Sequence, residues 1–469
     1  MSGQDETFDL VVVGGGTGGY VASIRAAQLG LRVALVEKDK IGGACLHRGC
    51  IPTKVLLESA EVYSLVRRAE EFGVMASDPR FDYARILHRK DSIVNRLYSG
   101  IQFLMKKNRI TVIEGRASLI AATTLVVTGI DGSQRELNGR DVILATGSEP
   151  KSLPGLEVDG DRILTSDHIF GLPEAPSSLI IIGAGAIGVE FASLFSDLGA
   201  RVSLVEVLPN ILPLEDQEIS QELEKVFKRR GIRVLTGARL LTETLAKRES
   251  GLEVQVETAG QRETLSGERM LVAVGRRGLV EGLGLEQLGV RTERGYVVVD
   301  KGMSTGIPHL YAIGDLIGGM LLAHVAMAEG VLAVETITGA GPAPLDYNRV
   351  PRGVYSRPQI GSLGLTEQEA MAKAHKVKVG RFPFRANGRA LIAGDQDGLV
   401  KVVAESDTGE LLGVHIIGPQ ATELIMEPAL AMFLESTAWE LGTSIRAHPT
   451  LAEAIGEAAL AVAGKAIHI

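Results

Sequence analysis

Cysteine, clustered basic residues and long apolar runs are all scarce in this chain. Only 2 of its 469 residues are cysteines, too few for the disulfide framework that stabilises small secreted domains. No run of apolar residues approaches the roughly 18 that a membrane-spanning helix needs. The N-terminal sequence MSGQDETFD is acidic where a signal peptide carries basic residues followed by an apolar stretch. We therefore expect a cytoplasmic protein, with no membrane as a partner.

The basic residues do not gather into patches. There are 49 of them, scattered along the chain and outnumbered by 57 acidic residues, which gives a formal net charge of -8. A nucleic-acid-binding surface requires concentrated positive charge, so the sequence argues against nucleic acid as a partner. Hydrophobic residues make up 45% of the chain and charged residues 23%, as in folded soluble proteins. At roughly 150 residues per domain, the length predicts about three packed domains.

The chain opens with a strand, a glycine-rich turn and a helix, in the order typical of a dinucleotide-binding fold. Apolar residues 10–13 predict a buried strand, a helical stretch follows up to Gly30, and a second strand at residues 32–36 ends in Glu37. The turn carries the pattern G-x-G-x-x-G, formed by Gly14, Gly16 and Gly19. Such a unit binds a pyrophosphate at the helix N-terminus and a ribose hydroxyl at the acid.

Each glycine of the pattern has its own physical role. Gly14 permits the tight turn, Gly16 lets the backbone approach a pyrophosphate, and Gly19 lets helix and strand pack closely. Glycine-rich turns between a strand and a helix also occur as plain structure, so a single copy of the pattern is weak evidence.

The whole unit recurs 169 residues later, which makes coincidence a poor explanation. A strand at residues 179–182 leads into a helix that closes at Gly199, and a strand at residues 201–205 ends in Glu206. The glycines of the second turn are Gly183, Gly185 and Gly188. Two dinucleotide folds predict two dinucleotides, as electron transfer between FAD and a nicotinamide requires. Glu206 is followed by Val-Leu-Pro without an arginine, which favours NAD over NADP.

Further along, shorter signals divide the chain. A strand at residues 142–145 followed by Thr146 and Gly147 predicts a crossing between domains, and a comparable crossing occurs after Gly275. Residues 305–315 predict a short strand ending in Gly314 and Asp315, whose carboxylate could meet a ribityl or ribose hydroxyl. Prolines and glycines between residues 339 and 358 indicate a linker. Strands at residues 400–403 and 413–416, together with helices, predict a separate C-terminal domain.

The two cysteines lie close together, in the segment Gly-Gly-Ala-Cys45-Leu-His-Arg-Gly49-Cys50-Ile-Pro52. Residues five apart in a regular helix have Cα atoms about 8.5 to 9 Å apart, whereas a disulfide needs less than about 7 Å. The pair can therefore bond only across an irregular turn, which Gly49 makes plausible. Pro52 suits a first helical turn, so Cys50 would lie at a helix N-terminus, where the dipole stabilises a thiolate.

Two other interpretations of the cysteines remain open at this point. They could be buried structural thiols, although the glycine-rich setting directly after a dinucleotide unit favours redox chemistry. They could also form half of a metal site. Metal is disfavoured because no second cysteine pair completes a zinc set and His47 alone does not supply it.

Five segments, in the same order, resemble motifs of the class I pyridine nucleotide-disulfide oxidoreductases. Along the chain they are the redox segment GGACLHRGCIPTKVLL, then ATGSEP, the nicotinamide segment IIGAGAIGVEFASLFSDLGARVSLVE, YAIGD followed by LAHVAMAEG, and HPTLAEA. The resemblance covers nearly the whole chain. Within the family it is closest to the members that oxidise protein-bound dihydrolipoamide to lipoamide in 2-oxo acid dehydrogenase complexes, reducing NAD to NADH.

The resemblance implies an α/β fold with two Rossmann-like dinucleotide-binding domains, a central domain and a C-terminal α+β dimerisation domain. The expected domains are residues 1–148, which bind FAD and carry the redox disulfide, residues 149–274, which bind NAD, residues 275–346, which complete the FAD site, and residues 347–469, which dimerise. The expected partners are a second copy of the chain, the lipoyl domains and the peripheral-subunit-binding domain of an acyltransferase component. No metal is expected.

The resemblance also assigns roles residue by residue. Cys45 is the thiol exposed to substrate and Cys50 the thiol against the flavin, while Lys54 lies near flavin N5 and Glu190 is its partner. His448 is the base, supplied from the partner subunit, and Glu453 orients it. The expected cofactor-binding residues also include Glu37, Thr146, Gly147, Glu206, Gly275, Asp315, Ala323 and His324, besides the six glycines of the two turns.

The chemistry needs these parts because a dithiol attacks a disulfide only as a thiolate. A histidine can remove the proton and a carboxylate fixes its tautomer. One departure from the family stands out, since the residues between the cysteines usually read Leu-Asn-Val-Gly and here read Leu46-His47-Arg48-Gly49. His47 and Arg48 could stabilise a thiolate electrostatically.

Other members of the family, and one function of another class, are alternatives to this interpretation. A mercuric reductase would need a further cysteine pair, a glutathione reductase would use NADP, and a flavin transhydrogenase would lack the cysteine pair that is present. A flavoprotein that only binds acyltransferase subunits as a scaffold would not reduce lipoamide with NADH.

Overall fold

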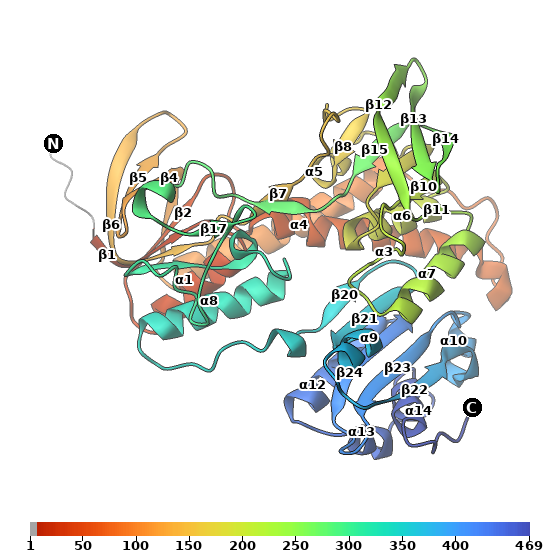
Figure 1. Cartoon of the computed structure of the whole chain (residues 1–469). Coiled ribbons are helices and arrows are strands. Elements are labelled where there is room, and N and C mark those ends of the chain that lie inside the picture. Colours follow the sequence, from red (N-terminus) through yellow and green to blue (C-terminus); the bar gives the residue numbers. More distant parts are fainter. Residues whose placement is uncertain (1–6) are drawn as a thin grey trace. The chain divides into compact units, whose positions relative to one another are not determined.

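The computed structural model describes residues 7–469 as parallel sheets covered by helices, accompanied by smaller antiparallel sheets (Figure 1). Residues 1–6, which include Asp5 and Glu6 and on which part of the signal-peptide argument rests, lie outside the described residues. The chain forms two compact units. The first unit comprises Met1–Val55, Arg85–Lys151 and Gly275–Leu345, and the second comprises Leu56–Ala84, Ser152–Val274 and Asp346–Ile469.

The first unit is built on a parallel sheet with an antiparallel extension. Its strand order is β3-β2-β1-β6-β5-β4, and β19 pairs with β6. The strands of this sheet are β1 (Thr7–Val13), β2 (Val33–Glu37), β3 (Thr111–Glu114), β4 (Arg116–Ala121), β5 (Thr124–Thr128), β6 (Gln134–Leu144) and β19 (Leu310–Ala312). Two short antiparallel pairs join β7 (Ser148–Pro150) to β16 (Arg276–Gly278), and β17 (Thr292–Glu293) to β18 (Tyr296–Val297).

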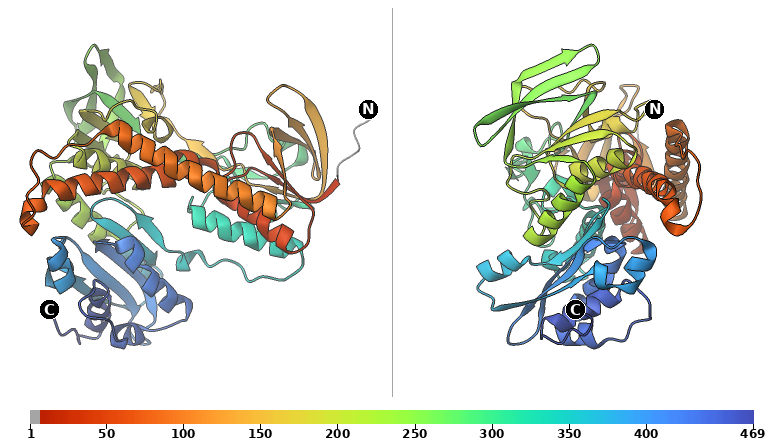
Figure 2. Two further views of the ribbon diagram at one scale, coloured as in Figure 1. Left: turned by 180° about the vertical axis from the view of Figure 1, so that it is seen from behind. Right: turned by 90° about the vertical axis from the view of Figure 1, so that its right-hand side faces the viewer.

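Helices cover one face of this sheet. They are α1 (Thr17–Gln28), α4 (Tyr83–Lys107) and α8 (Ala323–Ile337). The unit also contains α2 (Gly43–Arg48) and short 3₁₀ helices at Glu286–Leu288 and Gly314–Ile317. The helix α3 (Cys50–Arg67) begins in this unit. α1 and α8 lie side by side (Figure 2). Leu10 and Val12 of β1 pack with these helices, whereas Val11 and Val13 pack in the core on the opposite face. A strand buried on both faces explains the continuous apolar run.

The second unit repeats this plan around a parallel sheet of order β11-β10-β9-β15-β8. Its elements are β8 (Ile163–Thr165), α5 (Ser166–Ile169), β9 (Ser178–Ile182), α6 (Ala186–Asp197), β10 (Arg201–Val205), α7 (Gln217–Arg229), β11 (Arg233–Leu235) and β15 (Arg269–Val272). An antiparallel sheet of β12 (Ala238–Arg248), β13 (Gly251–Thr258) and β14 (Gln261–Gly267) extends from it. A 3₁₀ helix at Ala69–Phe72 also belongs to this unit.

The C-terminal part of the second unit is an antiparallel sheet of order β20-β21-β24-β23-β22 with helices. Its strands are β20 (Arg352–Val354), β21 (Gln359–Gly364), β22 (Val377–Pro383), β23 (Leu399–Glu405) and β24 (Leu411–Gly418). Its helices are α9 (Glu367–Ala372), α10 (Gly388–Ala393), α11 (Ala421–Leu424), α12 (Met426–Phe433), α13 (Ala438–Thr443) and α14 (Glu453–Ala461), with 3₁₀ turns at Tyr347–Arg349 and Phe384–Ala386.

The predicted α/β class with two dinucleotide-binding folds is confirmed, while two local predictions need correction. The strand expected at residues 305–315 is confined to β19, because Gly314 and Asp315 already belong to a 3₁₀ helix. The linker expected up to residue 358 ends earlier, because β20 pairs with β21 from Arg352 onward. The chain crosses between units at 151/152, 274/275 and 345/346, near the expected domain boundaries, and also at 55/56 and 84/85, inside the first expected domain. The division into four domains stays a prediction.

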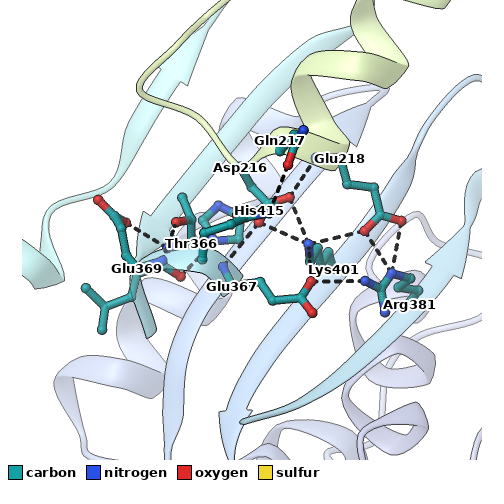
Figure 3. A network of polar contacts seen from close by, with 11 residues as sticks. Asp216, Gln217, Glu218, Thr366, Glu367, Glu369, Arg381, Lys401 and His415 are labelled. Carbon is teal, nitrogen blue, oxygen red and sulfur yellow. Dashed lines mark hydrogen bonds and ion pairs between the residues drawn. The ribbon is translucent and has the colours of Figure 1, made fainter. Parts of the chain in front are cut away.

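A buried ion cluster fastens α7 to the C-terminal sheet of the second unit (Figure 3). The ammonium of Lys401, on β23, is 1% exposed and lies 2.9 Å from Asp216, 2.8 Å from Glu367 and 3.2 Å from Glu218. Asp216 also caps α7 by accepting the N–H of Glu218. Burial alone would lower the pKa of Lys401, but hydrogen bonds to Asp216 and Glu367 raise it. Arg381 bonds to the two glutamates from the exposed side.

Removing the ammonium should therefore destabilise the second unit. Lys401→Met leaves buried Asp216 without its counter-charge, and we expect a loss of about 3 to 5 kcal/mol of unfolding free energy, measured by chemical denaturation. The matched control is Lys376→Met, because the Lys376–Asp407 ion pair is exposed and should contribute at most about 1 kcal/mol. Equal effects of the two substitutions would contradict this account of the cluster.

Candidate active site

The first glycine-rich turn has the geometry expected from its sequence. Gly14 adopts φ +105°, and a Cβ atom there would lie 2.3 Å from the carbonyl oxygen of Ala145. A Cβ atom at Gly19 would lie 1.8 Å from the carbonyl oxygen of Gly14, so helix and strand can pack only if this residue is glycine. A Cβ atom at Gly16 would meet nothing within 4 Å. The helix N-terminus is thus open at Gly16, where a pyrophosphate could approach.

The acid that ends β2 is bonded to this turn. One carboxylate oxygen of Glu37 accepts the N–H of Gly15 at 2.6 Å, and the other accepts the N–H of Asp39 at 2.9 Å. Glu37 also lines a cavity of about 370 Å³ together with side chains of α4 and β3. A carboxylate and an open cavity beside the turn fit the adenosine half of FAD.

The second turn repeats the first almost atom for atom. Gly183 has φ +98°, a Cβ atom at Gly188 would lie 1.9 Å from the carbonyl oxygen of Gly183, and a Cβ atom at Gly185 would meet nothing within 4 Å. Glu206 accepts the N–H of Ala184 at 2.7 Å with one oxygen and that of Leu208 at 2.9 Å with the other. The two sites are therefore built alike, and the residues of the second fit NAD.

Asp315 contacts two residues, Ser148 and Arg276, that the sequence did not identify. Its carboxylate accepts a hydrogen bond from the hydroxyl of Ser148. The Nε of Arg276 donates to the same hydroxyl at 2.7 Å and lies 3.8 Å from the carboxylate. Thr146 and Gly147 come immediately before Ser148, where the chain leaves β6. The hydroxyl of Thr146 donates to the carbonyl of Leu279, and Gly147 has φ +76°. Ser148 and Arg276 are thus candidate site residues that sequence reasoning missed.

The N-terminus of α8 contributes the last predicted cofactor residues. Ala323 and His324 are its first two residues. Further along the helix, Glu329 is only 2% exposed, and its carboxylate accepts the N–H of Gly314 at 2.7 Å, which holds the turn that carries Asp315. Glu329 was also missed, although a single carboxylate in the otherwise apolar sequence AHVAMAEGVLAV was a signal. Gly275 has φ +109° and accepts the N–H of Lys151 at 2.9 Å.

The two cysteines flank a break between two helices. Cys45 lies in α2, Cys50 is the first residue of α3, and Gly49 between them departs from helical geometry with φ -142° and ψ -115°. This is the irregular turn that a disulfide would require. A Cβ atom at Gly49 would lie 3.0 Å from the carbonyl oxygen of Ala44 in α2, so the tight turn that ends α2 favours glycine. Pro52 occupies the first turn of α3, as predicted.

The side chains of Cys45 and Cys50 lie within hydrogen-bonding distance of each other. A hydrogen bond with the Cys50 side chain and burial raise the pKa of Cys45, whereas the charge of Lys54 acts to lower it. Two thiols that share one hydrogen bond release their protons in sequence, so one is held protonated while the other ionises. Cys45 is half-buried and Cys50 is exposed. Their separate roles toward substrate and flavin stay predictions.

The predicted base and its carboxylate form a dyad in the second unit. The Nδ1 of His448 is 2.9 Å from Glu453, the first residue of α14, and the N–H of Thr450 donates to the other carboxylate oxygen at 2.8 Å. Burial acts to raise the pKa of Glu453, but the bonds from Thr450 and His448 lower it overall. The His448 side chain is 80% exposed and lines a cavity of about 290 Å³. Its Nε2 is therefore accessible to a proton donor.

Lys54 and Glu190 fall in different units. Lys54 lies on α3, one turn beyond Cys50, in the first unit. Glu190 is 5% exposed on α6 of the second unit and accepts the N–H of Tyr355 at 3.0 Å. Their pairing, like the approach of His448 to the cysteines, stays a prediction.

Among residues 7–469, no group of three or more His, Cys, Asp or Glu side chains could hold a metal ion. Over the same residues, every helix is too short or too polar to cross a membrane.

Known proteins match the chain over nearly its full length. The family model described as pyridine nucleotide-disulphide oxidoreductase matches residues 8–330, and that of the family's dimerisation domain matches residues 350–459. A dihydrolipoyl dehydrogenase of Bacillus subtilis is 49% identical, covering 98% of this chain and 99% of the relative. A dihydrolipoyl dehydrogenase of Zymomonas mobilis is 45% identical, with coverages of 98% and 99%.

Solved structures are similar over the same length. LpdA from Mycobacterium tuberculosis has a TM-score of 0.89 and 31% sequence identity, covering 97% of this chain and 99% of that one. The HOCl-induced flavoprotein disulfide reductase RclA from Escherichia coli, in its Cu(II) complex, has a TM-score of 0.86 and 27% identity, with coverages of 97% and 99%.

Proposed function

The chain belongs to the pyridine nucleotide-disulphide oxidoreductase family, and we propose that it acts there as a dihydrolipoyl dehydrogenase. It oxidises dihydrolipoamide to lipoamide through the Cys45–Cys50 pair and FAD, and it reduces NAD to NADH. The observation that carries the proposal is the dithiol pair at the break between α2 and α3. The pair directly follows one dinucleotide-binding unit, in a chain that contains a second.

FAD and NAD supply the electron transfer in this reaction. When bound, FAD would take up the electron pair of the reduced cysteines, and NAD would accept that pair as a hydride. The open backbone at Gly16 and the carboxylate of Glu37 would hold FAD, with Asp315 as a further contact. The equivalent open backbone at Gly185 and the carboxylate of Glu206 would hold NAD.

The protein's own side chains perform the thiol chemistry. Because Nδ1 of His448 is bonded to Glu453, its Nε2 is the nitrogen that takes the proton from a substrate thiol. The resulting thiolate attacks the sulfur of Cys45 in the Cys45–Cys50 disulfide, and Cys50 leaves as a thiolate. The second substrate thiol then displaces Cys45 from the mixed disulfide. Lipoamide is released, and the protein keeps both electrons as a reduced cysteine pair.

We propose further that the enzyme works as a homodimer within a 2-oxo acid dehydrogenase complex. The dimerisation domain at residues 350–459 supports the homodimer. The docking partners would be the lipoyl domains and the peripheral-subunit-binding domain of an acyltransferase component, and the cytoplasm would be its location. A protein that served such a complex only as a scaffold would have no need of the His448–Glu453 dyad or of the dithiol.

Nucleotide choice should depend on Glu206. A carboxylate that accepts from the ribose 2'-OH of NAD repels the 2'-phosphate of NADP, so wild type should reduce lipoamide much faster with NADH than with NADPH. Oxidised glutathione should be a poor substrate. Glu206→Ala should raise the KM for NADH and relax the discrimination against NADPH, as measured by steady-state kinetics with both nucleotides and both disulfides. A matched control is Glu37→Ala, which should leave the preference intact. An unchanged preference in Glu206→Ala would place nucleotide specificity elsewhere.

A heterodimer tests whether each active site combines two chains. Homodimers of Cys45→Ser and of His448→Gln should both be nearly inactive, the second because it loses a base worth roughly 10²- to 10⁴-fold. In the isolated heterodimer, one site takes intact Cys45 from one chain and intact His448 from the other, while the second site receives both defects. Lipoamide reduction should recover to about half of wild type per dimer. A heterodimer as inactive as its parents would mean that cysteines and histidine meet within one chain.

A further inference from the structure

The two residues that depart from the family pattern between the cysteines reach toward one segment of the first unit, residues 37–42. The Nε2 of His47 donates to the carbonyl oxygen of Ile41 at 2.9 Å, a partly buried hydrogen bond. The guanidinium of Arg48 lies 3.4 Å from the carboxylate of Asp39. Both contacts run from α2, which carries Cys45, back to the chain that follows β2.

Segment 37–42 is itself part of the first nucleotide site. The N–H of Gly42 donates to the carbonyl of Gly15 at 2.7 Å, while Glu37 accepts the N–H of Gly15 at 2.6 Å and that of Asp39 at 2.9 Å. The segment is thus bonded to the glycine turn at both of its ends. A displacement of Ile41 or Asp39 would be passed directly to the turn and to the carboxylate of Glu37.

His47 also contacts Tyr98 on helix α4. Its ring meets the ring of Tyr98 edge-on, with centroids 5.2 Å apart and planes at 74°. Tyr98, on α4, lines the cavity of about 370 Å³ together with Glu37, Asp39 and Ile41. One imidazole therefore braces both the segment and the helix that face each other across this cavity.

We propose that His47 and Arg48 are positioning residues for FAD, and that they hold segment 37–42 and Tyr98 in the arrangement that accepts the adenosine half of the cofactor. The inference rests on the use of FAD in the proposed function. His47 carries most of the effect, because its hydrogen bond is partly buried, whereas the Arg48–Asp39 pair is about half exposed and such pairs contribute little. FAD affinity is thereby linked to the helix that bears the substrate-facing thiol.

The test measures how tightly the holoenzyme keeps FAD. FAD release on dilution, followed by the fluorescence of the free flavin, gives the equilibrium dissociation constant. This constant should be about tenfold larger for His47→Leu than for wild type, because one hydrogen bond is lost. His47→Gln is the conservative control: its amide nitrogen can take the place of Nε2, so its constant should stay within about threefold of wild type. Arg48→Val should likewise change the constant by about threefold at most.

One result would overturn the proposal: an FAD dissociation constant for His47→Leu equal to that of wild type. If that unchanged constant came with a changed rate of Cys45 alkylation by iodoacetamide in the reduced holoenzyme, the imidazole would act on the thiol instead. Failure of the proposed function is a separate observation. If the wild-type protein binds FAD but does not reduce lipoamide with NADH, the proposed function is wrong, while the comparison of FAD dissociation constants still tests the roles of His47 and Arg48.

Discussion

Each nucleotide site is shaped by a carboxylate at the end of a parallel strand, which accepts the N–H of the adjoining glycine turn. Glu37 binds Gly15 in this way at 2.6 Å, and Glu206 binds Ala184 at 2.7 Å. The bond fixes the turn after β1 or β9, so that the N-terminus of α1 or α6 opens toward a ligand. The acid at the same time retains lone pairs for a ribose. The repeated interaction thus gives one chain two dinucleotide sites of the same design.

The redox pair depends on the first of these sites for its position. α2 begins directly after the segment that Glu37 and Gly15 hold, and the break at Gly49 then turns the chain into α3. Cys45 and Cys50 come together across that break, where their hydrogen bond raises the pKa of Cys45 and the charge of Lys54 opposes the increase. The helix break that allows a disulfide is therefore built onto the nucleotide-binding unit itself.

Much of this was predictable because it depends on local sequence rules. The glycine patterns, the acids at Glu37 and Glu206, the irregular turn at Gly49 and the contact of His448 with Glu453 are all short-range features that the structure contains, while their roles in binding and catalysis stay predictions.

What escaped prediction joins residues far apart in the chain. The contacts of Ser148 and Arg276 around Asp315 span more than 100 positions, and the buried Lys401–Asp216 pair spans 185. The contacts of His47 and Arg48 are local, but a sequence cannot tell that these side chains reach back to Ile41 and Asp39.

The central claim is that both nucleotide sites and the cysteine pair form one path for electrons. The most direct test is an anaerobic titration of the oxidised, FAD-containing protein with NADH, followed by a count of thiols after denaturation. The chain has 2 cysteines, so about one equivalent of NADH per chain should raise the count from none to two, whereas Cys45→Ser should keep a single thiol throughout. If NADH is consumed and the flavin is bleached while no thiols appear in the wild type, the cysteine pair lies outside the electron path and the account is wrong.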